Sequence, residues 1–355
     1  MTDLTKYLLE ETKLHPSLAP QDVVKLCYQA AFGAEHMLSD HSKALKYFQD
    51  EYAAAPEDDK ALFESIAPTV CRANLSAWKR LQLNPDWLWN LFLGATSGKG
   101  IMQKDSKVFT GYILQADKLC QLGKFPFSYE QWQEYIFDYT KSKPDNLPPV
   151  RHSAAYRDKE RPAYRILSGQ DATILPIFKA MAGMGKGIIA IDGRAASGKS
   201  TLAGYLRNII SAEVIAMDDF FLPPELRTPE RLVVPGGNIH HERFAHDVLP
   251  SLRSGQGFTY NGFDCSRMEY SSTPTKILPS LWRIVEGVYS CHPAFGDYMD
   301  IRVFMDVHSA EQKSRIETRN HPKIAADYFA KWIPMEETYF KEYKIRESAN
   351  VIIQT

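Results

Sequence analysis

A glycine-rich segment near the middle of the chain carries residue types that bind phosphate groups. Residues 193–200 have the sequence GRAASGKS, which matches the pattern G-x-x-x-x-G-K-[ST]. Glycines let such a loop curl so that its backbone N–H groups point at phosphate oxygens, and the amino end of the next helix adds partial positive charge. The spacing therefore predicts a nucleoside triphosphate site, with Lys199 on the β- and γ-phosphates and Ser200 on Mg²⁺.

Carboxylates at two other places supply what phosphoryl transfer requires. Asp218 and Asp219 follow the apolar run 213–217, and Glu286 ends the run 282–286. In open α/β sheets ligands bind at the carboxyl ends of the strands, so both acidic positions and the phosphate loop should meet in one crevice. One carboxylate accepts the proton of the attacking hydroxyl, and another helps to hold Mg²⁺. The arrangement predicts phosphoryl transfer to a hydroxyl.

Short apolar runs between helical stretches provide the strands that this crevice needs. Continuous apolar runs in such a context are typical of buried parallel strands. We therefore predict an α/β fold in the C-terminal half, with a P-loop NTPase-type parallel sheet flanked by helices. The expected strands are residues 187–192, 213–217, 282–286, 301–306 and 350–354.

The N-terminal half has a different periodicity. Apolar residues recur there at three- and four-residue spacing, as in residues 20–38, and alternation with period two is rare. Prolines and charges interrupt the helical pattern from residue 141 onward. We predict a mainly α-helical domain over residues 1–170, a linker with a helix over 171–185 and a P-loop kinase domain over 186–355.

The order of these motifs resembles that of the uridine kinase and phosphoribulokinase group of P-loop kinases. The matching segments are residues 193–200, MDDFF at 217–221, residues 260–267 and IVEG at 284–287, and the resemblance covers about half of the chain. It implies ATP as phosphoryl donor and Mg²⁺ as cofactor. The ATP-binding residues it implies are Gly193, Arg194, Ala195, Ala196, Ser197, Gly198, Lys199, Ser200 and Thr201.

The resemblance also implies roles for individual side chains. Asp218 matches the family's general base toward the substrate hydroxyl, and Glu286 matches its Mg²⁺-associated glutamate, beside Ser200. The family's arginine-bearing lid helix matches residues 306–319. Catalytic roles are thereby implied for Asp218, Lys199, Arg315 and Arg319, and substrate contacts for Asp219, Phe221, Asn238, His240, Tyr260 and Arg267.

Two departures from the nucleoside kinases concern substrate recognition. His240 stands where they usually carry an aspartate for the ribose, and their histidine near the base is replaced around Cys265. The function that the motifs predict is ATP-dependent phosphorylation of a hydroxyl on a small metabolite, a nucleoside or a related sugar compound.

Two other functions stay open at this point. One is a nucleotide-responsive binding or regulatory protein, whose nucleotide state is sensed by a partner. The other is a bifunctional enzyme with a second site in the helical half, for which His36, Arg72 and His152 are the candidates. No Asn-Lys-x-Asp pattern for guanine occurs, which disfavours a GTPase switch.

The composition limits which binding partners and which cellular compartment we expect for this protein. The 355 residues hold 42 Lys and Arg against 43 Asp and Glu, so nothing global attracts a nucleic acid. The five cysteines are scattered without a CxxC pair, and no uninterrupted apolar window approaches the roughly 18 residues of a membrane span. We expect a cytoplasmic protein that binds ATP and a small-molecule acceptor, binds neither nucleic acid nor membrane, and is compatible with homo-oligomer formation.

Overall fold

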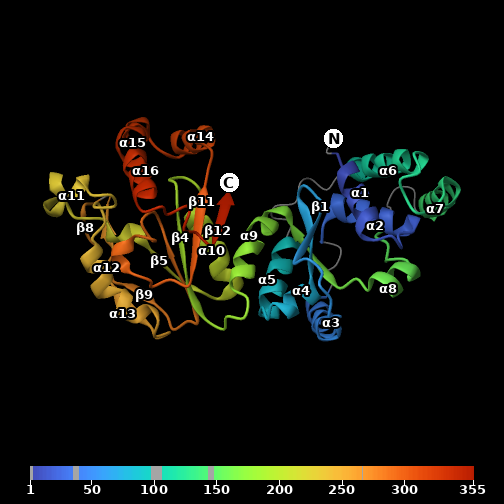
Figure 1. Cartoon of the computed structure of the whole chain (residues 1–355), viewed down its shortest axis with the longest axis horizontal. Helices are drawn as coiled ribbons and strands as arrows, with labels where there is room; N and C mark the ends of the chain where they lie inside the picture. The colour runs from blue at the N-terminus through green and yellow to red at the C-terminus, as the bar shows by residue number, and fades with distance from the viewer. Residues whose placement is uncertain (1–2, 35–39, 97–105, 143–147, 266) are drawn as a thin grey trace. The chain divides into compact units, whose positions relative to one another are not determined.

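The computed structural model describes residues 3–34, 40–96, 106–142, 148–265 and 267–355. The chain divides into two compact units, Met1–Ala182 and Gly183–Thr355. Each unit consists of helices around a sheet (Figure 1). Among the described residues, no helix has the length and apolar character that crossing a membrane requires.

A five-stranded parallel sheet forms the centre of the second unit. Its strand order is β12-β11-β4-β10-β5, and all four neighbouring pairs are parallel. The strands coincide with the predicted apolar runs, which confirms the predicted fold class of this half. They are β4 (Gly187–Gly193), β5 (Glu213–Ala216), β10 (Trp282–Glu286), β11 (Ile301–Asp306) and β12 (Val351–Gln354).

Helices and short hairpins complete the second unit. Helix α10 follows the phosphate loop and packs against β4, β5 and β10, where its buried Leu202, Leu206 and Ile209 meet the sheet. The helical elements are α10 (Lys199–Ile210), η2 (Met217–Phe220), η3 (Pro224–Leu226), α11 (Pro229–Val233), α12 (His241–Asp247), α13 (Leu249–Leu252), η4 (Pro293–Phe295), α14 (Ser309–Arg319), α15 (Pro322–Asp327), η5 (Tyr328–Trp332) and α16 (Ile333–Glu342). The paired short strands are β6 (Phe258–Tyr260) with β9 (Thr275–Ile277) and β7 (Phe263–Asp264) with β8 (Glu269–Tyr270).

The first unit is mainly helical, as predicted, but it also contains an antiparallel sheet of order β1-β2-β3. The periodicity predicts a mainly helical domain and singles out none of these strands. Strand β2 is buried at all five positions, although it contains Arg72 and Asn74, so it shows neither alternation nor a purely apolar run. The strands are β1 (Phe63–Ala67), β2 (Val70–Asn74) and β3 (Tyr164–Ser168).

Helix α9 (Gly169–Ala180) occupies most of the stretch predicted as a linker, residues 171–185. Ser168 and Asp171 cap it reciprocally, each side chain accepting the other's backbone N–H. Its apolar face packs on all three strands, so the helix belongs to the first unit rather than to a linker. The other helices are α1 (Thr5–Leu14), α2 (Pro20–Phe32), α3 (His41–Ala54), α4 (Leu75–Arg80), α5 (Pro85–Thr96), α6 (Ser106–Gln121), α7 (Tyr129–Ser142) and α8 (Ala154–Glu160).

A buried polar network crosses the core of the first unit. The fully buried Arg72 donates from Nη1 to both carboxylate oxygens of Glu11, at 2.7 and 2.9 Å, and from Nε and Nη2 to the side-chain oxygen of Gln29. Its guanidinium lies 4.8 Å from the ring centre of Tyr164. The charge of Arg72 is therefore fully compensated, as a buried ion requires.

His152 joins the same network through Tyr164. The His152 ring nitrogens lie 2.9 Å from Asp22 Oδ1 and 2.6 Å from the Tyr164 hydroxyl. His36, the third candidate for a second site, lies outside the described residues. Over the described part of the chain, no group of three or more His, Cys, Asp or Glu side chains is placed to hold a metal ion. The complete pairing of Arg72 and His152 is what a structural network requires, and a second activity stays a hypothesis.

Replacement of Arg72 by alanine tests this structural role. We expect Arg72→Ala to lower the free energy of unfolding by about 3–5 kcal/mol, because Glu11 would remain buried without its partner. Substitution of both partners, Arg72→Met with Glu11→Gln, should cost less than the single change. Urea unfolding of the full chain measures both effects. The exposed Lys6→Ala is the control, and an Arg72→Ala variant as stable as this control would contradict the assignment.

Candidate active site

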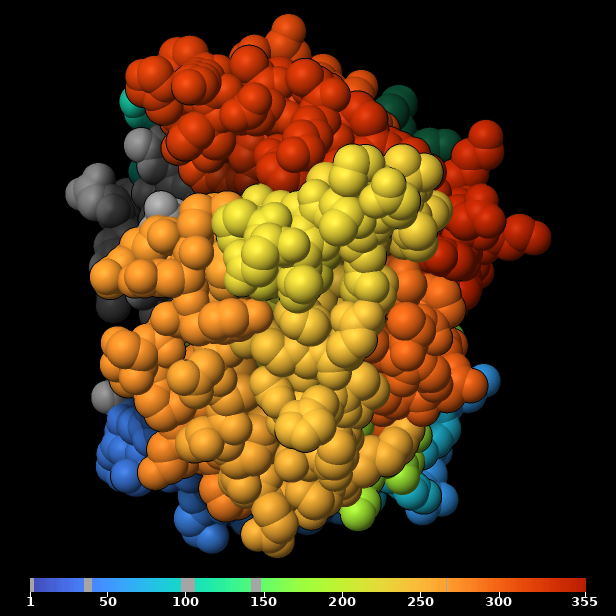
Figure 2. Space-filling view, turned by 90° about the vertical axis from the view of Figure 1, so that its left-hand side faces the viewer, coloured from blue at the N-terminus to red at the C-terminus, as the bar shows by residue number. Residues whose placement is uncertain are grey.

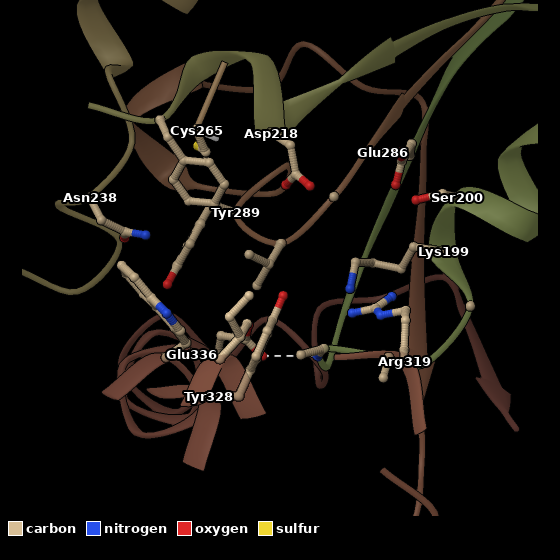
Figure 3. A pocket seen from close by; sticks show the side chains of 18 of the residues that line it. Lys199, Ser200, Asp218, Asn238, Cys265, Glu286, Tyr289, Arg319, Tyr328 and Glu336 are labelled. Carbon is tan, nitrogen blue, oxygen red and sulfur yellow. Dashed lines mark hydrogen bonds between the residues drawn. The ribbon is translucent and has the colours of Figure 1, made fainter. Parts of the chain in front are cut away.

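A cavity of about 560 Å³ lies within the second unit, at the carboxyl ends of β4, β5 and β10. Figure 3 shows side chains from the phosphate loop, from η2 and from the C-terminal helices converging on it. The crevice predicted at this sheet edge is therefore present. Its lining residues are Ala195, Ala196, Gly198, Lys199, Ser200, Thr201, Asp218, Phe221, Arg227, Asn238, Cys265, Met268, Glu286, Gly287, Val288, Tyr289, Arg319, Ile324, Tyr328, Trp332 and Glu336.

The phosphate loop has the backbone that anion binding needs. Gly193 has a φ of +134°, and a Cβ there would lie 2.1 Å from the carbonyl oxygen of Met305 on β11, so only glycine fits. Gly198, with a φ of +93°, caps α10, whose first N–H groups have no intrahelical partners. Lys199 Nζ donates to the carbonyl oxygens of Gly193 and Arg194 at 2.8 and 2.9 Å, which holds the ammonium group over the loop.

Asp218 and Glu286 lie where the sequence predicts them. Asp218 is in η2, directly after β5, and Glu286 ends β10. Burial raises the pKa of Asp218, the neighbouring Asp219 raises it further, and the charges of Lys199 and Arg319 oppose the rise. Burial likewise raises the pKa of Glu286, against a hydrogen bond with Ser200. Both carboxylates lack full charge compensation in the free protein, which favours a bound cation nearby.

The oxygen ligands around Ser200 fit a magnesium ion. Ser200 supplies a hydroxyl oxygen, and the hydrogen-bonded Glu286 supplies a carboxylate. Mg²⁺ prefers oxygen ligands and is usually held by one or two protein groups together with substrate phosphates and water.

The structure separates the two arginines that were predicted together. Arg319, at the end of α14, lines the cavity and acts electrostatically on Asp218. Arg315 lies outside the lining. It donates to the carbonyl oxygen of Ala196 at 3.2 Å, to the hydroxyl of Thr355 and to Glu311, so it braces the phosphate loop instead of facing the cavity.

Within the predicted ATP-binding segment, three residues also lie outside the cavity lining. Gly193 forms the close approach to β11, and Arg194 pairs with Asp306 at 2.8 Å and with Glu337. Ser197 is buried. The loop therefore meets the cavity through the remaining six residues of the segment.

The predicted substrate residues divide in the same way. Phe221 and Asn238 line the cavity, whereas Asp219, which is absent from the lining, accepts a hydrogen bond from the buried Tyr260 hydroxyl at 2.8 Å. His240 caps α12, and Arg267 pairs with Glu269 on the exposed surface. Asp219, His240, Tyr260 and Arg267 lie outside the cavity lining, and their substrate contacts stay predictions.

Sequence reasoning missed several lining residues. Tyr289 lies three residues after the predicted Glu286, so its closeness to a strand end was a usable signal. Arg227 lies in a proline-rich loop, and Tyr328, Trp332 and Glu336 lie in η5 and α16, where no motif marks them. Their place in the site follows from packing of the C-terminal helices rather than from local sequence.

Glu336 contacts the phosphate loop directly. Its Oε2 accepts the backbone N–H of Ala195 at 2.9 Å, and its side chain is buried. Burial raises the pKa of Glu336 to about 7, with Asp192 and Glu337 adding to the rise and Lys199 opposing it. The carboxyl group therefore changes charge near neutral pH beside the phosphate-binding loop.

Comparisons with known proteins find similar chains among solved structures. No protein-family model and no curated protein sequence matches the chain. Among solved structures it is similar to a "possible uridine kinase" from Bacillus stearothermophilus, at 19% identity over 52% of this chain and 98% of that one, with a TM-score of 0.40. It is also similar to a "putative fructose transport system kinase" from Silicibacter sp. TM1040, at 20% identity over 51% of this chain and 97% of that one, with a TM-score of 0.40.

The second unit has a P-loop NTPase-type fold. Its own sheet carries this conclusion, because the phosphate loop follows the central one of five parallel strands.

The pKa of Glu336 yields a prediction about stability. Because the folded-state pKa is raised to about 7 from 4.5, folding binds a proton between these values, so stability falls as pH rises through this window. We expect Glu336→Gln to gain stability relative to the wild type between pH 5 and pH 8, by roughly 1–3 kcal/mol. Chemical denaturation of the ligand-free protein at both pH values measures this.

The exposed Glu342→Gln, on the same helix, controls for the loss of one negative charge. If the stability difference between Glu336→Gln and the wild type were equal at pH 5 and pH 8, burial would not oppose the charge of Glu336.

Proposed function

We propose that the second unit transfers the γ-phosphoryl group of Mg²⁺·ATP to a hydroxyl of a small metabolite, a nucleoside or a related sugar compound. The observation that supports this most strongly is the meeting of five side chains in one cavity at the sheet edge. These are the side chains of Lys199, Ser200, Asp218, Glu286 and Arg319. Together they supply phosphate binding, metal binding and a proton acceptor, which are the parts that phosphoryl transfer needs.

Asp218 is the proton acceptor in this proposal. Its carboxylate, which lines the cavity, would take the proton of the acceptor hydroxyl at an Oδ atom while the phosphoryl group moves to the hydroxyl oxygen. A raised pKa makes a carboxylate a stronger base. General-base catalysis is most efficient when the pKa of the base lies near the operating pH. The charges of Lys199 and Arg319 oppose that rise in pKa.

The remaining side chains position and neutralise the phosphates. Lys199 and Arg319 face the same cavity, where charge develops on the transferring group. Ser200 and Glu286 would hold Mg²⁺, which supplies further charge neutralisation when bound. Tyr328 and Trp332 in η5 form an aromatic wall that would limit the access of water.

The first test is ADP formation from Mg²⁺·ATP, without an acceptor and with nucleosides, pentoses, phosphopentoses and pantothenate. We expect one class of acceptor to increase ADP formation. Asp218→Asn should lower turnover by about 10²–10⁴-fold while ATP still binds, because the base is lost but the phosphate loop is intact. Lys199→Ala should abolish turnover.

Asp297→Asn, an exposed aspartate paired with Arg302, is the matched control. Unchanged turnover in Asp218→Asn would remove Asp218 from the role of base. Slow ATP hydrolysis that no acceptor accelerates and that Asp218→Asn does not alter would favour a nucleotide-responsive binding protein instead.

A further inference from the structure

Arg227 brings to the cavity a positive charge that the proposed transfer does not use. It follows η3, at the start of the proline-rich loop that leads to α11. Its Nε donates to the carbonyl oxygen of Leu222 at 2.8 Å. That bond fixes the guanidinium and leaves the edge with Nη1 and Nη2 available. Within the described ranges, no carboxylate lies within ion-pair distance of Arg227.

Hydrogen bonds place Arg227 near Asn238 in the cavity wall. Arg227 Nε donates to the carbonyl oxygen of Leu222, and the Leu222 N–H donates to the carbonyl oxygen of Asn238 at 2.9 Å. Both Arg227 and Asn238 line the cavity. Burial and Asp218 raise the pKa of Cys265, another lining residue, and the charge of Arg227 lowers it.

Figure 3 shows the two sides of the cavity. Asn238, Tyr289 and Cys265 lie on one side in this view, Lys199 and Arg319 lie on the other, and Asp218 lies between them. Figure 2 shows the proline-rich loop segment (yellow) at the surface, between the C-terminal helices (red) and the segment around residues 250–280 (orange). Because Arg227 is linked to Asn238 through Leu222, a ligand group held by Arg227 would lie on the Asn238 side of the cavity.

A second polar atom on this side also lacks a partner. Asn238 is 4% exposed, and its Oδ1 has no hydrogen-bond donor in the described structure. A buried acceptor without a donor is costly, so a ligand O–H or N–H is the natural partner. Phe221 adds an apolar surface beside these two groups.

We propose that the phosphoryl acceptor carries an acid group, a carboxylate or a phosphate ester, which Arg227 binds while Asn238 Oδ1 accepts a ligand donor. The planar guanidinium matches both acid groups through two parallel hydrogen bonds. Lys199, Arg319 and Mg²⁺ would neutralise the triphosphate, so Arg227 is the cation that remains for the acceptor. The inference rests on the proposed phosphoryl transfer, because it concerns the second substrate of that reaction.

Matched pairs of acceptors test the inference. We compare ribose 5-phosphate with ribose, glycerate with glycerol and pantothenate with pantothenol, in the wild type, Arg227→Gln and Arg227→Lys. At least one acid should exceed its neutral partner in kcat/KM. Arg227→Gln should raise the KM of that acid about 10- to 100-fold and leave the KM of ATP unchanged. Arg227→Lys should restore part of the loss, since lysine keeps the positive charge but lacks the two parallel N–H donors of the guanidinium.

The control is Arg207→Gln, a surface change on α10 that should leave all constants unchanged. Thermal unfolding with each compound gives a second measurement that does not depend on turnover. The acids should raise the Tm of the wild type more than their neutral partners, and Arg227→Gln should remove this difference.

The outcomes separate the two proposals. If no acceptor increases ADP formation, the proposed transfer fails, and the Tm comparison still decides whether Arg227 binds an acid. If the neutral compounds react and stabilise as well as the acids, or if no acid-dependent Tm shift occurs, the acid-binding role is overturned while transfer can stand. Equal KM values for the acid in the wild type and Arg227→Gln would also overturn it.

Discussion

One buried carboxylate connects the segments that form the site. Asp192 is fully buried near the end of β4 and accepts the N–H groups of Gly193 at 2.7 Å, Tyr289 at 3.2 Å and Cys291 at 3.0 Å, and the Tyr339 hydroxyl at 2.8 Å. These donors belong to the phosphate loop, the turn after β10 and helix α16. Burial raises the pKa of Asp192, and the hydrogen bonds from Cys291, Tyr339 and Gly193 oppose the rise, together with the charge of Lys199. The three segments keep their relative positions through this group.

The turn after β10 depends on that support because its backbone is strained. Gly287 has a φ of +130°, and a Cβ there would lie 2.9 Å from the Cβ of Met217. Tyr289 has a φ of +75°, in the left-handed region that costs a non-glycine residue roughly 1–3 kcal/mol. The strained turn points Tyr289 into the cavity beside Asn238, so the bond from its N–H to Asp192 stabilises the geometry of the acceptor side.

The sequence was sufficient for the residues whose positions follow from a strand end. The phosphate loop, Asp218 and Glu286 each follow an apolar run, and parallel strands bring such ends to one edge. Arg315 and Arg319 could not be separated in this way, because residues four apart lie on the same helix face. The packing of α14 on the loop decides between them, and Arg227 depends on a turn without any motif. In the first unit, the charged Arg72 interrupts the apolar run of the buried strand β2. The sequence pattern therefore did not predict this strand.

Arg72 and Arg227 differ in how far the fold itself supplies partners for their side chains. Arg72 has a carboxylate, an amide and an aromatic ring as partners, so its interactions are complete within the fold. Arg227 and the Oδ1 of Asn238 have no such partners among the described residues, although both line a cavity. An unpaired buried acceptor costs about 1–3 kcal/mol in the free protein, and a ligand that pairs with it recovers that free energy. The unpaired Oδ1 of Asn238 destabilises the free protein, and the same unpaired oxygen selects a ligand that can donate a hydrogen bond to it. Both effects therefore have the same physical origin.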